Sequence, residues 1–262
     1  RETNAIIAEL SKEPRDKMTR NGLRTMKTLY SISLSPYNIQ FIPVTLLKTL
    51  EATAKNGNDT AKSITLAILR ELVDNPAMTE AIARAKTLVR TIFFVTKNRI
   101  KEIRQMRENM SENQRREVVF LEETLAGFAA RLSLNPMGRQ ALARFKEETL
   151  STLVIFSNSC PDSVPLQVFL GAFCAALQTE KELSKAAAQT DFMLSNLALI
   201  QTSTKDSIVS LGLLVLDLIG REEWGHEFLL NVKTIECISS VLMRCLPNME
   251  PKEEPESPES SP

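Results

Sequence analysis

Residues 117–154 constrain the fold most, because they form two apolar helical patterns with a break between them. From 118 to 132, apolar residues recur at spacings of three and four, the period of an amphipathic α-helix. Residues 135–138 contain Asn-Pro and Gly, signals that a helix tolerates only near its ends. A second helical pattern follows, from 142 to 154. A helix with one apolar face cannot bury that face alone, so the unit predicts neighbouring copies of itself.

The same order of apolar helix, polar break and apolar helix recurs in four other stretches. The break prolines Pro36 and Pro76 are 40 residues apart, and the later three breaks are about 43 apart. Pro136 follows Pro76 by 60 residues, which is one repeat plus an insertion. Such periods of about 40–47 residues are typical of helical repeat proteins, although a non-repetitive helical protein can show them by chance. The four stretches are residues 23–50, 64–92, 166–199 and 208–243.

The composition favours an all-α class. The chain has 262 residues, of which 43% are hydrophobic, enough to bury a large core. It contains only 8 glycines and few alternating apolar runs, so strands have little support. No window is apolar enough for a transmembrane helix, and the first residues do not resemble a signal peptide. The chain starts at Arg1 without a methionine, and we expect it to be a fragment of a longer protein.

Three regions are expected. Residues 1–19 are predicted to form a capping helix and linker, and residues 20–247 the repeat domain with a charged insertion at about 97–116. Residues 248–262 are rich in Pro, Ser and Glu and cannot bury a core, so we expect a disordered acidic tail. Ser257 and Ser261 each precede a proline and are candidate phosphorylation sites; an unmodified tail is the alternative.

One run resembles a known repeat. Residues 29–38, Leu-Tyr-Ser-Ile-Ser-Leu-Ser-Pro-Tyr-Asn, are followed by Ile42 and by Leu46-Leu47. This run resembles the armadillo repeat, which ends one helix in a Leu-x-Asn-Leu-type stretch, crosses a polar break and starts another helix with spaced aliphatics. The resemblance extends loosely over most of residues 20–246. It implies a right-handed α-solenoid, or superhelix, of about five repeats whose concave groove binds a peptide segment or a partner domain.

The chain departs from one armadillo pattern. Importin-alpha proteins carry a ladder of Asn with interleaved Trp on the groove helices, which binds a peptide backbone. The sole Trp of this chain is Trp224, which lies in a break. Residues 194–197, Leu-Ser-Asn-Leu, match the motif but fall in the second helix of the fourth copy, either by chance or because the register shifts there. The positions that correspond to the ladder lack Asn and are Ser31, Glu71, Arg131, Ala176 and Asp217.

The armadillo resemblance also selects candidate binding residues. The helix before each break lines the groove in that family, and the charges on these helices change from basic in the first half to acidic at the end. Each residue is alternatively an ordinary exposed side chain. Trp224 either packs locally or belongs to an interface, where Trp is enriched. The groove candidates are Lys27, Ser31, Arg70, Glu71, Arg131 and Asp217.

The charged insertion supplies the alternative function. Its Ile and Met residues recur at three and four, which predicts a thin amphipathic helix that leads into a polar loop near 111–113. It is either a solvated helix extension or a docking element for an acidic partner or a nucleic-acid backbone; its apolar face is too narrow for a membrane surface. The formal net charge is zero, which gives no global attraction to nucleic acid. The candidate basic contacts are Arg99, Lys101, Arg104 and Arg107.

The sequence presents no catalytic constellation. It has one histidine, His226, four cysteines without CxxC spacing, and no Gly-rich phosphate loop. Cys174 and Cys237 lie in apolar helical patterns and are expected to be buried thiols. The acidic pairs at 122–123 and 147–148 are expected on exposed helix faces. We therefore expect no catalytic residue, no metal and no cofactor.

These observations predict a non-catalytic scaffold or adaptor that binds a segment of a partner protein on a helical-repeat surface. We expect it inside the cell, in the cytoplasm or nucleus, and not at a membrane. The alternative is a nucleic-acid-associated factor that uses residues 97–116, and an enzyme with an unrecognised site is the third class. The sequence leaves the partner and the oligomeric state open.

Overall fold

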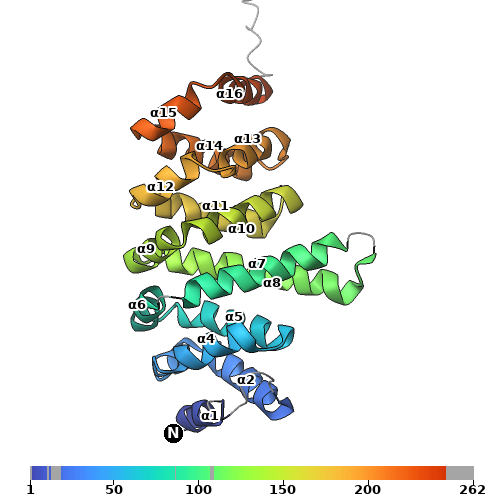
Figure 1. Ribbon diagram of the computed structural model, residues 1–262, viewed down its shortest axis with the longest axis vertical. Helices are drawn as coiled ribbons and strands as arrows, with labels where there is room; N and C mark the ends of the chain where they lie inside the picture. Colours follow the sequence, from blue (N-terminus) through green and yellow to red (C-terminus); the bar gives the residue numbers. More distant parts are fainter. Residues whose placement is uncertain (1, 11, 13–18, 86, 107–108, 246–262) are drawn as a thin grey trace, which may run out of the picture.

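A computed structural model describes residues 2–10, 12, 19–85, 87–106 and 109–245. Within these residues every regular element is a helix and no strand occurs, which confirms the all-α class. Figure 1 shows the helices stacked one above another in chain order, with the N-terminal helices at the bottom and the C-terminal helices at the top. Arg107, Ser257, Ser261 and the predicted tail at 248–262 lie outside the described residues.

A first row of long helices runs through the stack. Each helix of this row packs against the next one in the row, which is the third helix after it in the chain. The N-terminal helix α1 (Glu2–Leu10) packs against the first member. The row consists of α2 (Arg20–Ser33), α5 (Asp59–Leu72), α8 (Glu112–Ser133), α11 (Val164–Leu177) and α14 (Asp206–Gly220).

A second row repeats this arrangement. Its helices also pack successively on one another, and several contact the first row as well. The row consists of α4 (Leu46–Asn56), α7 (Leu88–Gln105), α10 (Lys146–Ser159), α13 (Phe192–Thr202) and α16 (Val232–Cys245).

Short helices form a third row at the breaks. From α6 onward, each packs against the next short helix. The row consists of α3 (Pro36–Ile39), α6 (Pro76–Arg84), α9 (Pro136–Arg144), α12 (Lys181–Ala188) and α15 (Glu223–Leu229).

The Asn-Pro breaks start the short helices. Asn75 is the N-cap of α6, and its side chain accepts a hydrogen bond from the Ala77 N–H. Asn135 caps α9 in the same way, and a proline follows each asparagine at the first helical position. An Asn cap satisfies an otherwise unpaired N–H, and proline has no N–H to leave unpaired. The breaks predicted at these positions are confirmed.

Each copy contains three helices, where the sequence pattern predicted two. In the third copy, the apolar pattern at 142–154 continues through the end of α9 and into α10. Phe145 separates the two helices with φ −105° and ψ 44°, and its side chain is buried. The apolar period hides this bend, because the residue at the bend is itself part of the core.

Two glycines allow the short helices to turn back closely. A Cβ on Gly138 would lie 2.0 Å from the Leu132 carbonyl oxygen, and one on Gly225 would lie 2.1 Å from that of Ile219. The two glycines occupy the same place in the third and fifth copies. At both places the short helix contacts the backbone at the end of the preceding long helix, so a side chain has no room.

The core lies between the first and second rows. Four buried phenylalanines from α7, α8, α10 and α11 meet there. The ring centroids of Phe93 and Phe128 are 6.4 Å apart, those of Phe93 and Phe169 5.8 Å, and those of Phe156 and Phe169 5.7 Å. These contacts join consecutive copies through both rows at once.

The stretch at 97–116 belongs to two long helices. Helices α7 and α8 pack against each other and extend beyond the edge of the stack (Figure 1). Residues 97–105 end α7, and 112–116 begin α8. Ser111 and Gln114 form a capping box at the start of α8. Glu112 and Asn113 are therefore helical, and the loop predicted at 111–113 ends two residues earlier than expected, at Ser111.

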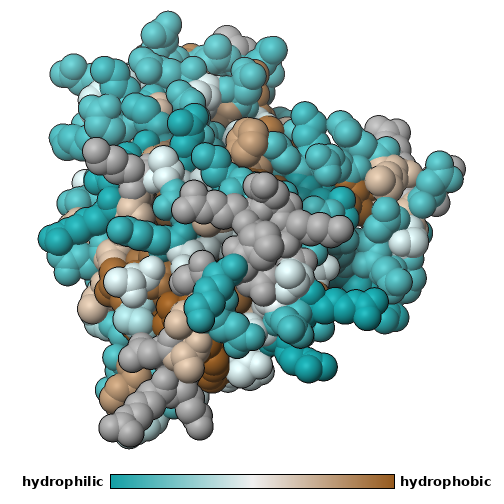
Figure 2. Space-filling model, turned by 60° about the horizontal axis from the view of Figure 1, so that its bottom comes forward, coloured by the Kyte–Doolittle hydropathy of each residue, from teal (hydrophilic) through white to brown (hydrophobic). Residues whose placement is uncertain are grey.

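The surface is mostly hydrophilic on the face that Figure 2 shows, with hydrophobic side chains in scattered areas between the polar ones. The most exposed aromatic side chains include Tyr37 and Phe41, which are 70% and 58% exposed. Their rings contact each other edge to face with centroids 5.4 Å apart. This pair belongs to the first copy, in and just after α3.

Candidate functional site

The predicted groove residues all lie on the first row, but they do not form one cluster. Lys27 and Ser31 are exposed on α2, where the Ser31 hydroxyl donates to the Lys27 carbonyl at 3.1 Å. Asp217 is exposed on α14 and pairs with Arg221, one turn along the same helix. The interactions described for Ser31 and Asp217 are therefore with residues four positions away in the chain. The middle candidates are brought together.

Glu71 is the centre of that middle group and joins α5 to α8. The Arg131 Nη1 donates to Glu71 Oε2 at 2.8 Å and to the Arg70 carbonyl oxygen at 2.9 Å. The Arg70 Nε donates to Glu71 Oε1 at 2.7 Å. Asp74 adds a second carboxylate, 3.2 Å from Arg131. Arg70 lies close over α8, since a Cβ on Gly127 would be 3.1 Å from its Cδ.

Electrostatics hold Glu71 ionised. Its side chain is only 9% exposed, and burial raises the pKa of Glu71. Hydrogen bonds from Arg131 and Arg70 outweigh burial, so the pKa lies below its ordinary value. Arg70, Glu71 and Arg131 thus satisfy one another and connect adjacent copies. Within the part of the chain that the structure describes, these three residues therefore have a structural role, which is to connect α5 to α8.

Trp224 and Asn196 both pack against neighbouring helices. The half-buried indole Nε1 of Trp224, on α15, lies 3.3 Å from the Ser184 hydroxyl oxygen on α12. Asn196 is buried on α13 and donates from Nδ2 to the Gly212 carbonyl of α14 at 3.0 Å. The 194–197 match to the armadillo motif therefore places its asparagine between two rows rather than on an exposed surface.

Two of the predicted basic contacts, Arg99 and Arg104, are paired with carboxylates. The Arg99 guanidinium donates to Glu117 at 2.7 Å and also lies 3.2 Å from Asp59. Arg104 pairs with Glu122 at 2.6 Å. Lys101 is exposed, and the described residues supply no ion pair for it. Arg99 and Arg104 therefore link α7 to α8, and Arg99 also links it to α5.

The acidic pairs are not both exposed, which corrects the sequence prediction. Glu122 and Glu148 are buried, whereas Glu123 and Glu147 are exposed. Burial raises the pKa of Glu122, and the single guanidinium of Arg104 opposes this without overcoming it. Glu148 accepts a hydrogen bond from Arg90 at 2.7 Å. Adjacent helical residues point about 100° apart, so one member of each pair faces inward, toward an arginine on another helix.

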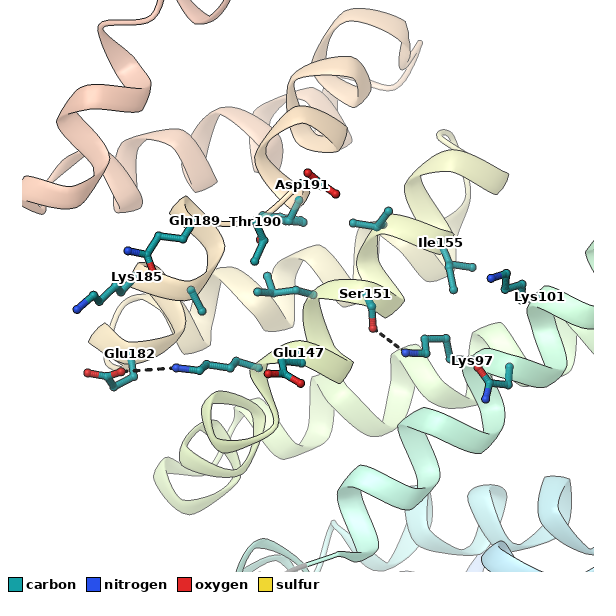
Figure 3. A pocket seen from close by; sticks show the side chains of 16 residues that line it. Lys97, Lys101, Glu147, Ser151, Ile155, Glu182, Lys185, Gln189, Thr190 and Asp191 are labelled. Atoms are coloured by element: carbon teal, nitrogen blue, oxygen red, sulfur yellow. Dashed lines mark hydrogen bonds and ion pairs between the residues drawn. The ribbon is translucent and has the colours of Figure 1, made fainter.

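A cavity of about 850 Å³ lies on the opposite side of the core from the first row, between α7, α10, α12 and the start of α13 (Figure 3). Its lining combines an apolar floor with charged side chains. The apolar residues are Leu150, Val154, Ile155, Ala186 and Phe192. The charged residues are Lys97, Lys101, Lys146, Lys185, Glu147, Glu182 and Asp191.

The two ends of this cavity carry different sets of charged side chains. Figure 3 shows Lys97 and Lys101 at one end and Glu182 and Lys185 at the other. The Lys97 Nζ donates to the Ser151 hydroxyl at 2.8 Å. Burial lowers the pKa of Lys97, the Glu148 carboxylate opposes this, and the charge of Lys101 adds to the lowering. The cavity was not found from sequence, because its four walls come from residues 97–192.

Metal-binding and nucleophilic groups do not converge in the part of the chain described. No three His, Cys, Asp or Glu side chains there are placed to hold a metal ion. Burial raises the pKa of Cys174 to about 12, so this thiol is protonated at neutral pH, and burial also raises that of Cys237. Nor is any described helix both long and apolar enough to cross a lipid bilayer.

The chain matches no protein-family model, and no curated protein matches it significantly. We therefore infer its function from its geometry.

Proposed function

We propose that this chain is an armadillo-like α-solenoid that acts as a non-catalytic scaffold or adaptor and holds a segment of a partner protein. The observation that carries the proposal is the packing of long helices against the third helix after them, in two continuous rows with short helices at the breaks. Such one-dimensional stacks present long surfaces that suit extended partners. An intracellular location, in cytoplasm or nucleus, is part of this proposal.

The first row offers one binding surface. Lys27 and Ser31 are exposed at its N-terminal end, and Asp217 is exposed at its C-terminal end. In the middle, Arg131 remains 32% exposed while it pairs with Glu71, and Asp74, which also pairs with Arg131, remains 47% exposed. A partner of mixed charge would therefore find a basic end, a paired centre and, at the other end, the Asp217 carboxylate paired with Arg221.

A nucleic-acid partner has less support. Arg99 and Arg104 of the predicted basic contacts already face carboxylates. A phosphate backbone would have to compete with Glu117 and Glu122 for the two guanidinium groups. Such binding would weaken steeply with salt.

Affinity capture from a cell extract tests the proposal. The full chain is compared with the charge-reversal variant Lys27→Glu/Asp217→Lys and with Lys48→Glu, a control on the exposed side of α4. We expect a protein that survives nuclease treatment, is retained by the control and is lost with the double variant. Equal retention by all three chains would contradict the first-row surface. Capture that disappears with nuclease would favour the nucleic-acid alternative.

A further inference from the structure

The cavity between α7, α10, α12 and α13 has the size of a binding site. Its volume of about 850 Å³ falls within the range of about 300–1,000 Å³ that ligand pockets occupy. It is formed by second-row and third-row helices, so it is separate from the first-row surface. Its walls come from the end of α7 in the second copy, from α10 in the third copy, and from α12 and the start of α13 in the fourth copy.

The floor of the cavity is aliphatic. Val154 and Ile155 on α10 and Ala186 on α12 are half-buried, so part of each side chain still contacts solvent. Leu150 and Phe192 are buried beneath them. Covering such a surface with aliphatic side chains is favourable by about 25 cal/mol per Å² of apolar area removed from water. The floor therefore favours an apolar ligand group.

One end of the cavity carries two like charges. Lys97 and Lys101 are four residues apart on α7 and so share one helix face. Lys97 is hydrogen-bonded to Ser151, and neither lysine has an ion pair with any carboxylate in the described residues. Two ammonium groups so placed repel each other, and one of them is partly desolvated. A carboxylate placed between them would relieve the repulsion.

The other end has mixed charge and excludes a highly anionic ligand. Lys146 pairs with Glu182 at 3.6 Å, and Lys185 lies beside them. Glu147 and Asp191 also line the cavity. These carboxylates would repel a run of phosphates. The ligand that fits has one acidic end and an aliphatic body.

We propose that this cavity binds a short acidic-aliphatic segment of a partner protein, with a Glu or Asp carboxylate held by Lys97 and Lys101 and aliphatic side chains on Val154, Ile155 and Ala186. The inference rests on the scaffold function and names its partner class and a second surface. The segment lies with its acidic group toward α7. Its apolar side chains point to α10 and α12.

Fluorescence anisotropy with a labelled peptide of alternating Glu and Leu tests this site on the full chain. We expect the peptide to bind, and a matched peptide of Gln and Leu to bind at least tenfold more weakly. The variant Lys97→Gln/Lys101→Gln should lower the affinity for the Glu–Leu peptide at least tenfold, and Ile155→Asp should lower it to the same extent. The control variant Lys48→Gln/Lys55→Gln removes two exposed lysines of α4, outside both proposed surfaces, and should leave the affinity unchanged.

Other results would overturn the inference. They are equal binding of the Glu–Leu and Gln–Leu peptides, no binding of either, or an affinity that the cavity variants do not change. Dodecanoate that displaces the peptide and binds more tightly would indicate a small amphiphile site, and tighter binding of a single-stranded oligonucleotide a nucleic-acid site. Far-ultraviolet circular dichroism and thermal unfolding of each variant verify that it is folded.

The two proposals fail separately. If the peptide does not bind but capture still depends on Lys27 and Asp217, the cavity assignment is wrong and the scaffold function stands. If the peptide binds as expected and the variant Lys27→Glu/Asp217→Lys captures the same protein as the original chain, the cavity rather than the first row is the binding surface. Failure of both would remove the scaffold function itself.

Discussion

The Glu71 cluster on the first row and the lysine end of the cavity differ in whether their charged side chains form ion pairs. At Glu71, two guanidinium groups from α5 and α8 surround a nearly buried carboxylate. At the cavity, Lys97 and Lys101 share a helix face with no carboxylate in ion-pair contact among the described residues. The first group joins α5 to α8, whereas the two lysines both lie on α7 and only Lys97 reaches another helix, through Ser151 on α10. Charge is satisfied internally in the first group and remains available in the second.

The difference separates structural charge from charge that a ligand can use. Removing one member of a satisfied cluster leaves its partners desolvated without compensation. Lys97 donates a hydrogen bond to Ser151, but neither it nor Lys101 forms an ion pair with a described carboxylate, so removing the two lysines leaves no carboxylate without its counter-charge. Substitutions in the Glu71 cluster should therefore mainly lower the free energy of unfolding. Substitutions of Lys97 and Lys101 should mainly weaken ligand binding.

The largest expected effect is at Glu71. Glu71→Ala leaves Arg70 and Arg131 without their shared carboxylate and should lower the free energy of unfolding by about 3 kcal/mol. Urea unfolding followed by circular dichroism measures this. Glu123→Ala, on the exposed side of α8, is the control and should change it by less than about 0.5 kcal/mol. Similar losses of unfolding free energy in Glu71→Ala and Glu123→Ala would show that the Glu71 cluster is no more important for stability than an exposed carboxylate.

A smaller effect is expected at Glu122. This carboxylate is as buried as Glu71 but pairs with one guanidinium, that of Arg104. Burial keeps the pKa of Glu122 raised, so its ionised form is less well stabilised than that of Glu71. Glu122→Gln should therefore cost about 1 kcal/mol, less than Glu71→Gln under the same urea titration. The reverse order would show that Arg104 alone compensates burial fully.

The same two carboxylates should respond to pH with opposite sign. The folded-state pKa of Glu71 lies below its unfolded value of 4.5, so its contribution is present above pH 4.5 and is lost as the pH falls through the folded-state pKa. The pKa of Glu122 is raised, so stability from this group falls as the pH rises from 4.5 through the folded-state pKa. Unfolding at pH 7 and at acidic pH should show the deficit of Glu71→Gln narrowing on acidification and that of Glu122→Gln widening.

The smallest effect is expected at the cavity lysines. Lys97→Gln/Lys101→Gln removes a like-charge pair at spacing four, so the free energy of unfolding should stay within about 0.5 kcal/mol of the original chain or rise slightly. Thermal unfolding at low salt measures this, with Lys48→Gln as the reference. A loss well above 1 kcal/mol would show that the Lys97–Ser151 hydrogen bond contributes strongly to stability and would weaken the contrast with Glu71.

Local signals in the sequence predicted the helical class and the position of several breaks. The period of three and four, and the Asn-Pro pairs at 75–76 and 135–136, act within one or two turns of chain. The additional bend at Phe145 escaped prediction, because an apolar residue continues the pattern whether the helix bends or not. Arg70, Glu71 and Arg131 were selected as groove candidates from the armadillo resemblance, and the structure shows them bonded to one another.

The sequence by itself determined that the chain forms amphipathic helices separated by capped breaks, because those properties depend on neighbours along the chain. The tertiary structure alone decided which polar partner each charged group finds on another helix. Glu71 reaches Arg131 across 60 residues, and Lys97 reaches Ser151 across 54. Pairing of this kind depends on which helix faces lie opposite each other in the stack, and so does the cavity between α7, α10, α12 and α13.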